Sequence, residues 1–325
     1  MRAAFYEKNG AARDVLSVAE VETPKPGPGE VRVRLKTSGV NPSDVKGREG
    51  RTRKIAFPRV IPHSDGAGEI EAVGEGVPAS RKGERVWIWN AQWKRPFGTC
   101  AEYVVLPAQY AVPLPSHISD EAGACLGIPA MTAWNAVEVA GAAKGKTILV
   151  TGGAGGVGHY AIQFAKARGA TVLTTISSEA KAALAKQAGA DHAIDYKREN
   201  VGERVMALTG KAGIDAVIEM DVAANARLYP GILHARSQAV IYGTGSVEAT
   251  IPSQFLLTSG IRLQYIFVYE LTPAERTSAV TGINRMLENK TLINNVALTL
   301  PLNDIVAAHE AVEQGKTMGN VVVTL

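Results

Sequence analysis

The sequence predicts an α/β protein that combines a doubly wound parallel sheet with a smaller β-rich part. Three observations predict this class. The first third of the 325 residues contains short strand patterns between glycine-rich turns and no helical pattern. Strand and helix patterns alternate after Ser119, and repeated units of this kind build a parallel sheet. Hydrophobic residues make up 46% of the chain and charged residues 20%, which is enough apolar surface for a sizeable core.

The β-rich part begins at residues 31–36, where apolar and basic side chains alternate as in a half-buried strand. A Pro-Gly-Pro-Gly turn at 26–29 precedes this strand. Further strands are expected at 67–74, 85–89 and 101–106.

The second part begins at Ser119, a predicted helix N-cap followed by Asp120 and Glu121, since acidic side chains in a first turn favour the helix dipole. Strands are expected near 147–151, 171–176, 192–195, 214–219, 238–243 and 261–268, with helices between them. The chain is expected to end with a helix near 273–289, a strand near 296–300, a helix near 303–314 and a strand at 320–325.

Composition excludes several classes of protein. Two Cys, neither in a Cys-x-x-Cys pair, build no disulfide framework and no cysteine-bound zinc lobe. The first eight residues lack the apolar run of a signal peptide, and no run approaches the ~18 apolar residues of a membrane helix. We therefore expect a cytoplasmic protein.

Positive charge is concentrated in one segment. Residues 46–59 contain six Lys or Arg and one acid, whereas the whole chain has a net charge of +4. No basic face or known module indicates nucleic-acid binding. Two interpretations remain: a solvated basic loop, which is slightly favoured, or a loop that attracts a phosphorylated cofactor or an anionic substrate.

A dinucleotide site is predicted by the glycines of residues 151–158. A G-x-G-x-x-G motif begins at Gly153, directly after an apolar strand and before a helix. In this context the glycines permit a tight turn, let the backbone approach a pyrophosphate and bring the helix against the strand. The alternative, a tight loop without a ligand, does not account for the surrounding βα units.

The end of the next strand favours NADPH over NADH. An NAD site places Asp or Glu there, which accepts a hydrogen bond from the ribose 2′-hydroxyl. Here Ser177 and Ser178 follow the strand, with Lys181 close behind. Hydroxyls and an ammonium group suit a 2′-phosphate. Alternatively, Ser177 caps the next helix and Lys181 is a surface residue.

Two related glycine motifs are excluded. Short-chain dehydrogenases pair their glycine loop with a Tyr-x-x-x-Lys motif, and none of the nine Tyr here has Lys four residues later. A P-loop requires Lys after its last glycine, whereas His159 follows Gly158.

Landmark motifs extend over nearly the whole chain. They are Met1–Ala3, Gly39–Asp44, Ser64–Gly68, Gly127–Ala133, the loop at 151–158 and Gly319–Asn320. In this order and spacing the chain resembles the zinc-free, zeta-crystallin-like quinone reductases of the medium-chain dehydrogenase/reductase superfamily. The resemblance implies a Rossmann NADPH-binding domain at 120–268, inserted into a GroES-like β-rich catalytic domain at 1–119 plus 269–325. It also implies a homodimer.

Zinc alcohol dehydrogenases share this scaffold, but their metal ligands are missing here. By resemblance, Asn41, Ser64 and Ile128 stand where Cys, His and Cys ligands are expected. His63, one position away, is expected to be a packed or exposed histidine. We therefore expect no metal. Without that Lewis acid, the remaining chemistry is hydride transfer to an acceptor that needs little activation.

The resemblance also implies candidate residue roles. Asn41 and Asp44 would line the nicotinamide and substrate cleft as catalytic residues, with Asn41 donating a hydrogen bond to the acceptor oxygen. Alternatively they form an Asn-Pro turn with a structural Asp. Lys46 stands where several family members have Tyr, which leaves the proton donor open. The candidate cofactor-binding residues are Asn41, Thr132, Gly155, Gly156, Val157, Gly158, Ser177, Ser178, Lys181, Tyr196, Tyr242, Gly243, Thr244, Phe267, Val268 and Asn320.

Some of these residues are placed by strand ends. Residues 242–244 are expected to end the fifth strand of the parallel sheet, and residues 267–268 the sixth, at the edge where ligands bind. Three tryptophans, Trp87, Trp89 and Trp93, are expected to pack in the core rather than line an aromatic pocket.

The first functional hypothesis is an NADPH-dependent quinone oxidoreductase that works without a metal. Quinones are strong hydride acceptors because reduction makes their ring aromatic. A second hypothesis keeps the fold and the cofactor but reduces the double bond of an enone or alkenal. A third is an NADPH-binding protein that is kept for stability or interaction rather than turnover.

Overall fold

The computed structural model describes every residue from Met1 to Leu325 and divides the chain into two compact units. The first unit comprises Met1–Pro129 and Val280–Leu325, and the second comprises Ala130–Ala279. These bounds lie about ten residues beyond the expected 119/120 and 268/269. Two elements explain the difference: Asp120–Gly123 (α3) contacts strands of the first unit, and Pro273–Glu288 (α10) runs across the second boundary.

The second unit contains the predicted doubly wound parallel sheet. Its strand order is β10-β9-β8-β11-β12-β13, and all neighbouring strands are parallel. The first three strands along the chain, β8 to β10, form one half of the sheet. The next three, β11 to β13, form the other half on the opposite side of β8, as in a doubly wound sheet. The strands are β8 (Thr147–Val150), β9 (Thr171–Ile176), β10 (His192–Asp195), β11 (Ile214–Glu219), β12 (Leu233–Ile241) and β13 (Arg262–Tyr265).

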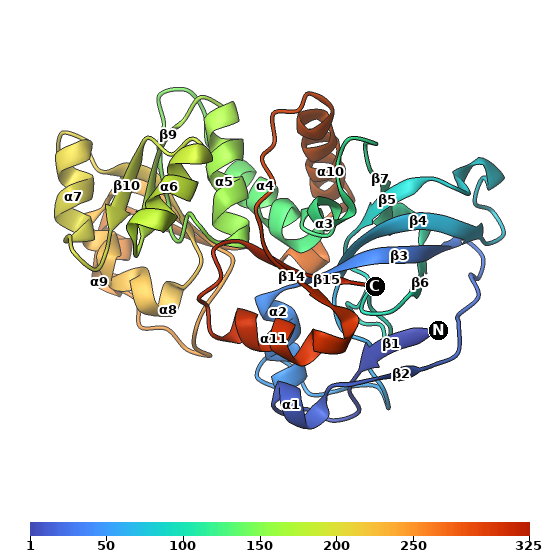
Figure 1. Cartoon of the computed structure of the whole chain (residues 1–325). Helices are drawn as coiled ribbons and strands as arrows, with labels where there is room; N and C mark the ends of the chain where they lie inside the picture. The colour runs from blue at the N-terminus through green and yellow to red at the C-terminus, as the bar shows by residue number, and fades with distance from the viewer. The chain divides into compact units, whose positions relative to one another are not determined.

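Apolar side chains on both faces of this sheet explain why it is covered by helices on both sides (Figure 1). Leu149, Leu173 and Val217 belong to the core that includes residues of α7, α8 and α9. Their neighbours along the strands point to the other face, and α5 contacts β8 and β9. The helices are α4 (Met131–Val139), α5 (Gly156–Ala167), α6 (Glu179–Gln187), α7 (Val201–Leu208), α8 (Val222–Asn225) and α9 (Ser253–Ser259).

Two expected strand ends are wrong. β12 ends at Ile241, so residues 242–244 follow the strand instead of ending it. β13 ends at Tyr265, and Phe267 precedes a 3₁₀ turn that begins at Val268. The last ladder contact is Ile266 N donating to Ile241 O at 3.0 Å, after which β13 has no further strand residue to pair with.

The first unit is built around β3 (Glu30–Val40), which pairs antiparallel with three other strands, β4, β6 and β15. Its sheet has the order β14-β15-β3-β4-β5-β7. Val31, Val33 and Leu35 of β3 are buried in one core, as the alternating pattern predicts. The other strands are β1 (Arg2–Phe5), β2 (Ser17–Glu20), β4 (Asp65–Val73), β5 (Arg85–Ile88), β6 (Tyr103–Pro107), β7 (Ala111–Pro113), β14 (Val296–Pro301) and β15 (Asn320–Thr324).

Helices of the first unit are few and short, but two of them, α1 (Ala12–Val15) and α2 (Pro42–Glu49), lie in the first third of the chain, where the expectation of no helix is wrong. α11 contacts α2, β14 and β15, and it contributes Ile305 and Ala308 to a second core. Ser119 is the predicted N-cap, because its hydroxyl accepts a hydrogen bond from Ala122 N at 3.2 Å. The helix ends at Gly123 and a π-helical turn follows at Leu126–Ala130. The helices are α1 (Ala12–Val15), α2 (Pro42–Glu49), α3, the C-terminal part of α10 and α11 (Ile305–Glu313).

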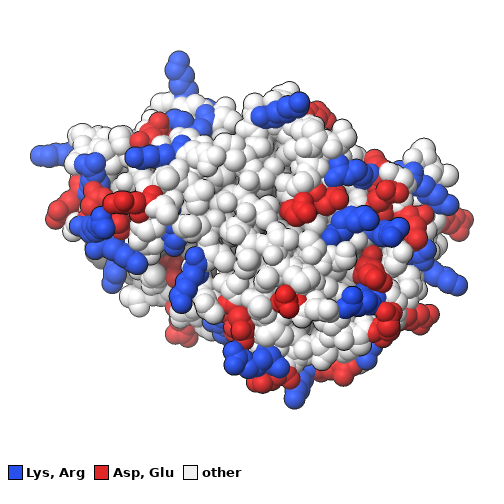
Figure 2. All heavy atoms as spheres, in the orientation of Figure 1, with Lys and Arg blue, Asp and Glu red and all other residues white.

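Surface charge is mixed in sign. On the face shown in Figure 2, Lys and Arg alternate with Asp and Glu instead of forming a continuous basic surface. The basic segment 46–59 is largely neutralised, since three of its arginines form ion pairs: Arg48 with Glu313 and Glu49, Arg51 with Glu49, and Arg59 with Glu7.

Three further features concern the core and hydropathy. Trp87 and Trp89 are buried, whereas Trp93 is only partly buried. Both cysteines, Cys100 and Cys125, are buried and free. No helix has the length and apolar character needed to cross a membrane.

Candidate functional site

The predicted glycine loop lies between β8 and α5, where its glycines have distinct steric surroundings. A Cβ on Gly158 would lie 2.3 Å from Gly152 O, and one on Gly153 would lie 2.2 Å from Thr174 Oγ1. These two positions therefore require glycine for close packing. By contrast, a Cβ on Gly155 would meet nothing closer than Gly152 O at 3.3 Å. Gly155 is the N-cap of α5, and the first N–H groups of a helix have no partner within it.

Open space beside a helix N-terminus fits a pyrophosphate. No acidic residue lies in the first turn of α5, so no side chain competes with an anion there. Candidate residues Gly156 and Val157 begin this turn. A side chain of β9 fixes the glycine loop, because Gly152 N donates to Thr175 Oγ1 at 3.0 Å.

The carboxyl end of β9 carries hydroxyls and an ammonium group. Lys181 Nζ donates to Ser177 Oγ at 3.1 Å, so these two side chains lie together as one group. Ser178, rather than Ser177, caps α6, because its hydroxyl accepts from Lys181 N at 3.3 Å. The first acid, Glu179, is 91% exposed and faces Arg198 at 3.6 Å. The group that would bind a ribose 2′ substituent is thus cationic.

Tyr196 lies next to this group at the end of the neighbouring strand. Its backbone N–H donates to Ile176 O at 3.1 Å, and its side chain is 54% exposed. Further candidate cofactor-binding residues of the second unit, residues 242–244, lie beyond the carboxyl end of β12 in the same sheet. Gly243 contacts the backbone of Met220 so closely that a Cβ would lie 2.2 Å from Met220 O. Tyr242 N donates to Glu219 O at 3.0 Å, which places residues 242–244 just beyond β12.

Three further candidates differ in exposure. Phe267 is 52% exposed, with its ring 5.2 Å from that of Tyr269, whereas Val268 and Thr132 are buried. Asn320 belongs to the first unit, where its side chain donates to Asn295 O at 3.1 Å. The structure therefore gives Asn320 a local structural partner.

A buried carboxylate beside the glycine loop was not predicted. Glu219, at the end of β11, is 0% exposed, and its Oε1 accepts hydrogen bonds from Thr151 Oγ1 at 3.0 Å, Asp221 N at 2.7 Å and Asn225 Nδ2 at 2.8 Å. Its Oε2 has no partner, and burial raises the pKa of the carboxyl. The sequence did contain a signal for this residue, because Glu219 follows an apolar run at the end of a predicted strand. A carboxyl group buried at such a position needs hydrogen-bond partners.

The first unit brings Asn41 and Asp44 together with a third residue, Asp65. Asn41 is the N-cap of α2, and its backbone N–H donates to Asp44 Oδ2 at 2.8 Å. Asn41 Nδ2 donates to Asp65 Oδ2 at 2.7 Å, and Ile128 N donates to Asp65 Oδ1 at 2.8 Å. Asn41 therefore links two buried carboxyl groups, which we call the carboxyl cluster (Asn41, Asp44 and Asp65).

Burial dominates the electrostatics of this cluster. It raises the pKa of Asp44 to about 7, although the hydrogen bond from Asn41 N opposes the shift. It raises the pKa of Asp65 as well, and the nearby Asp44 acts in the same direction. Desolvation penalises the charged form of both groups. Part of the cluster is thus protonated near neutral pH.

Zinc does not fit these residues. No group of three or more His, Cys, Asp or Glu is placed to hold a metal ion. Asn41 and Ile128, two of the positions where ligands are expected by resemblance, both interact with the carboxylate of Asp65. The carboxyl groups of Asp44 and Asp65 are the only donors of zinc-ligand type in this set, which is fewer than the three or four Cys, His, Asp or Glu ligands of a zinc site.

His63 is neither a ligand nor exposed. Its Nε2 lies 3.0 Å from His309 Nε2, and its Nδ1 lies 2.8 Å from Ser38 Oγ, which in turn lies 2.7 Å from Thr99 Oγ1. Thr99 donates to the carbonyl of Asp65.

The protons in this chain of hydrogen bonds have one consistent arrangement. Thr99 must donate to a carbonyl, so Ser38 donates to Thr99 and His63 Nδ1 donates to Ser38. Burial lowers the pKa of His63 to about 3, which keeps it neutral, and His309 Nε2 then donates to His63. We call His63 and His309 the histidine pair.

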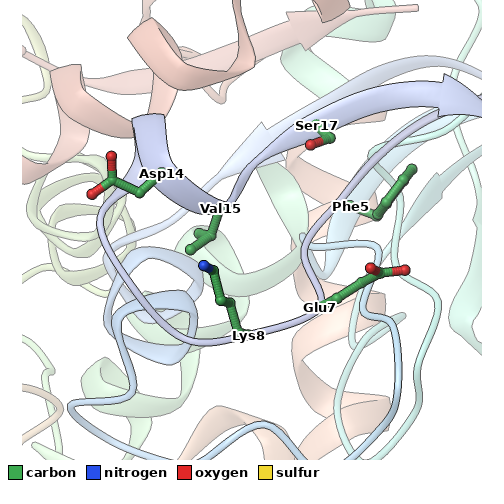
Figure 3. A pocket seen from close by; sticks show the side chains of 6 residues that line it. All are labelled: Phe5, Glu7, Lys8, Asp14, Val15 and Ser17. Atoms are coloured by element: carbon green, nitrogen blue, oxygen red, sulfur yellow. The ribbon is translucent and has the colours of Figure 1, made fainter.

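The hollows found elsewhere in the first unit do not contain these residues. The one in Figure 3 lies beside β1, α1 and β2 and is lined by Phe5, Glu7, Lys8, Asp14, Val15 and Ser17. A second is lined mostly by apolar side chains, among them Phe57, Ile61 and Phe97, and also by Glu7, Glu22 and Arg59. None of the predicted site residues lines either hollow.

Comparisons with known proteins agree with this fold. Residues 27–116 match the family described as "Alcohol dehydrogenase GroES-like domain", and residues 156–284 match "Zinc-binding dehydrogenase". A quinone oxidoreductase of Rattus norvegicus is 34% identical over 251 residues, which cover 76% of this chain and 75% of the rat protein. The chain therefore belongs to the medium-chain dehydrogenase/reductase superfamily and, within it, to the quinone oxidoreductase family.

Two further similarities concern the reaction and the cofactor. A 2-haloacrylate reductase of Burkholderia sp. is 28% identical over 99% of this chain and 98% of its own length. A mycobacterial protein solved in complex with NADPH is 28% identical, with a TM-score of 0.90 and full coverage of both chains. The predicted fold class, a parallel Rossmann sheet inserted into a GroES-like β-rich part, is confirmed.

Proposed function

We propose that this chain is an NADPH-dependent quinone oxidoreductase that transfers hydride without a metal. The observation that carries the proposal is the cationic group of Ser177, Ser178 and Lys181 at the end of β9, close to the open glycine loop. Relatives named quinone oxidoreductase and a neighbour solved with NADPH support it.

NADPH would be held by groups on the sheet edge of the second unit. The loop at Gly155–Gly158 and the N-terminus of α5 would bind the pyrophosphate. Lys181 and the two serines would bind the 2′-phosphate, with Tyr196 beside them. When bound, NADPH supplies the hydride from its nicotinamide. Thr132, residues 242–244, Phe267 and Val268 are proposed to line that part of the site, and Asn320 is proposed from resemblance alone.

Asn41 and Asp44 are the proposed catalytic residues. Asn41 Nδ2 donates to Asp65 Oδ2, and a hydrogen bond of the Asn41 side chain also lowers the pKa of Asp44. An acceptor oxygen would take the place of Asp44 as the partner of the second N–H. Asp44, whose pKa lies at about 7, can hold a proton near neutral pH. The carboxyl cluster would thus supply a donor and a protonated group without a metal.

The test is the loss of NADPH absorbance by purified, EDTA-treated protein. A small quinone and a conjugated enone are offered in parallel, and both assays are repeated with NADH. We expect rapid oxidation with the quinone and a preference for NADPH. Binding of NADPH without turnover of either acceptor would overturn the proposed activity.

One observation favours a second candidate, a reductase of conjugated carbon–carbon double bonds. The similarity to a 2-haloacrylate reductase extends over nearly the whole chain. Turnover of the enone alone in the same assay would establish this alternative. The homodimer and the cytoplasmic location stay predictions, which sedimentation and cell fractionation test.

A further inference from the structure

One arginine of the basic segment 46–59 has no carboxylate partner. The other arginines of this segment are each paired with glutamate. Arg53 forms no ion pair, and its Nη2 donates to Gln92 Oε1 instead. A half-buried guanidinium whose hydrogen-bond partner is neutral can still form charge-assisted hydrogen bonds with an anion.

Neutral neighbours hold Arg53 in place. Gln92 is 5% exposed, and its Nε2 donates to Arg95 O at 2.8 Å, which turns its Oε1 toward Arg53. Arg53 Cζ lies 5.4 Å from the centroid of the Trp93 ring, within the range of a cation–π interaction. These contacts reduce the mobility of the guanidinium without cancelling its charge.

Arg53 lies beside the helix that begins with the carboxyl cluster. A Cβ placed on Gly47 of α2 would lie 3.3 Å from Arg53 Nε. Asp44 lies three residues earlier on the same helix, which puts it on the same face as Gly47. The charge of Arg53 also lowers the pKa of Asp44, against the larger effect of burial. The guanidinium and the proposed reaction centre are therefore neighbours.

We propose that Arg53 binds an anionic group on the electron acceptor, so that the enzyme selects quinones or conjugated alkenes that carry a carboxylate or a similar oxyanion. This inference rests on the proposed oxidoreductase function and deepens it. The planar guanidinium fork can form two parallel hydrogen bonds with an oxyanion, which fixes the acceptor as well as attracting it.

The experiment compares two acceptors that differ by one anionic group, 1,2-naphthoquinone and 1,2-naphthoquinone-4-sulfonate, at saturating NADPH. The variants are Arg53→Ala, Arg53→Lys and the matched control Arg51→Ala. The control removes the same charge from the same segment, but Arg51 is 57% exposed and already paired with Glu49. Thermal melting and an NADPH titration check that each variant folds and binds the cofactor.

We expect Arg53→Ala to raise KM for the sulfonated quinone about tenfold or more relative to KM for the neutral one, because a hydrogen bond to a charged group is lost. Arg53→Lys should restore part of the difference, and Arg51→Ala should leave the ratio of the two KM values unchanged. Equal effects of Arg53→Ala and Arg51→Ala on that ratio would overturn the inference and leave the oxidoreductase function standing. No turnover of either quinone by the wild type would overturn the function itself, and the inference with it.

Discussion

At the residue scale, the cofactor preference depends on Lys181. Replacing Lys181 with Ala removes the ammonium group that bonds to Ser177, and we expect the Kd for NADPH to rise about tenfold with little change for NADH, because only NADPH carries the 2′-phosphate. Fluorescence titration with both nucleotides measures this. Lys186→Ala, an exposed lysine of the same helix, is the control. Equal losses for both nucleotides would contradict the phosphate role of Lys181.

Asn41 has a visible structural role as well as a proposed catalytic one. Asn41→Ala should lower kcat and leave the Kd for NADPH nearly unchanged. It should also lower the free energy of unfolding by about 1–3 kcal/mol, because Asp65 Oδ2 loses its donor. Asp65→Asn separates the two effects, since it alters the same hydrogen bond but keeps the Asn41 amide. If both variants lose stability alike and kcat is unaltered, Asn41 only forms the turn.

Asp44 gives stability a dependence on pH. Its pKa of about 7 lies above the ordinary value of about 3.9, so the folded protein retains a proton that the unfolded chain releases. The resulting stability is complete below about pH 4 and is lost as pH rises toward 7, by up to about 1.4 kcal/mol per pH unit. Denaturant titrations from pH 4 to 8 isolate this contribution as the difference between the free energies of unfolding of the wild type and of Asp44→Asn. We expect that difference to shift against the wild type as pH rises from 4 to 7. The exposed control Asp14→Asn should keep the wild-type dependence of stability on pH. If Asp44→Asn also kept it, or if Asp14→Asn changed it as much, the role of Asp44 would be contradicted.

At the scale of elements, the turn between β8 and α5 separates glycines needed for packing from one that leaves room for a ligand. Gly158→Ala puts a Cβ against Gly152 O at 2.3 Å, so the loop must shift, and we expect both the melting temperature and NADPH affinity to fall. Gly155→Ala meets nothing closer than 3.3 Å and should keep the melting temperature nearly constant while it weakens NADPH. Differential scanning fluorimetry and titration test the pair. Unweakened NADPH binding by Gly155→Ala would show that the pyrophosphate does not approach here.

At the scale of the whole molecule, we expect the buried histidine pair to reduce the free energy of unfolding in acid. Burial lowers the pKa of His63 to about 3 and that of His309 well below its ordinary value, while both titrate near 6.5 when unfolded. The stability that His63 contributes is present above about pH 6.5 and is lost as pH falls toward 3, by up to about 1.4 kcal/mol per pH unit. His309 adds a loss of the same sign below pH 6.5. Asp44 has the opposite effect between pH 4 and 6.5. We therefore expect the acid loss to be steepest in Asp44→Asn, and smaller when His309→Gln is added. Equal slopes in the two variants would refute this.

The strands of the parallel sheet show which features a local sequence pattern predicts and which it does not. Residues 171–176, 192–195 and 214–219 form strands as expected, because apolar runs between turns are read from neighbouring residues alone. The ends of β12 and β13 were misplaced, because pairing with adjacent strands decides where a strand stops. The division into units also depends on packing that no local pattern contains.

The sequence by itself determined the parallel sheet, the glycine loop and the absence of an acid after β9, because each depends on residue spacing along a few adjacent turns. The tertiary structure decided which polar groups meet. Asn41 reaches Asp65 across 24 residues, Arg53 reaches Gln92 across 39, and His63 reaches His309 across 246. Burial then sets their protonation, since the cost of a charge depends on the surroundings that only the folded chain provides.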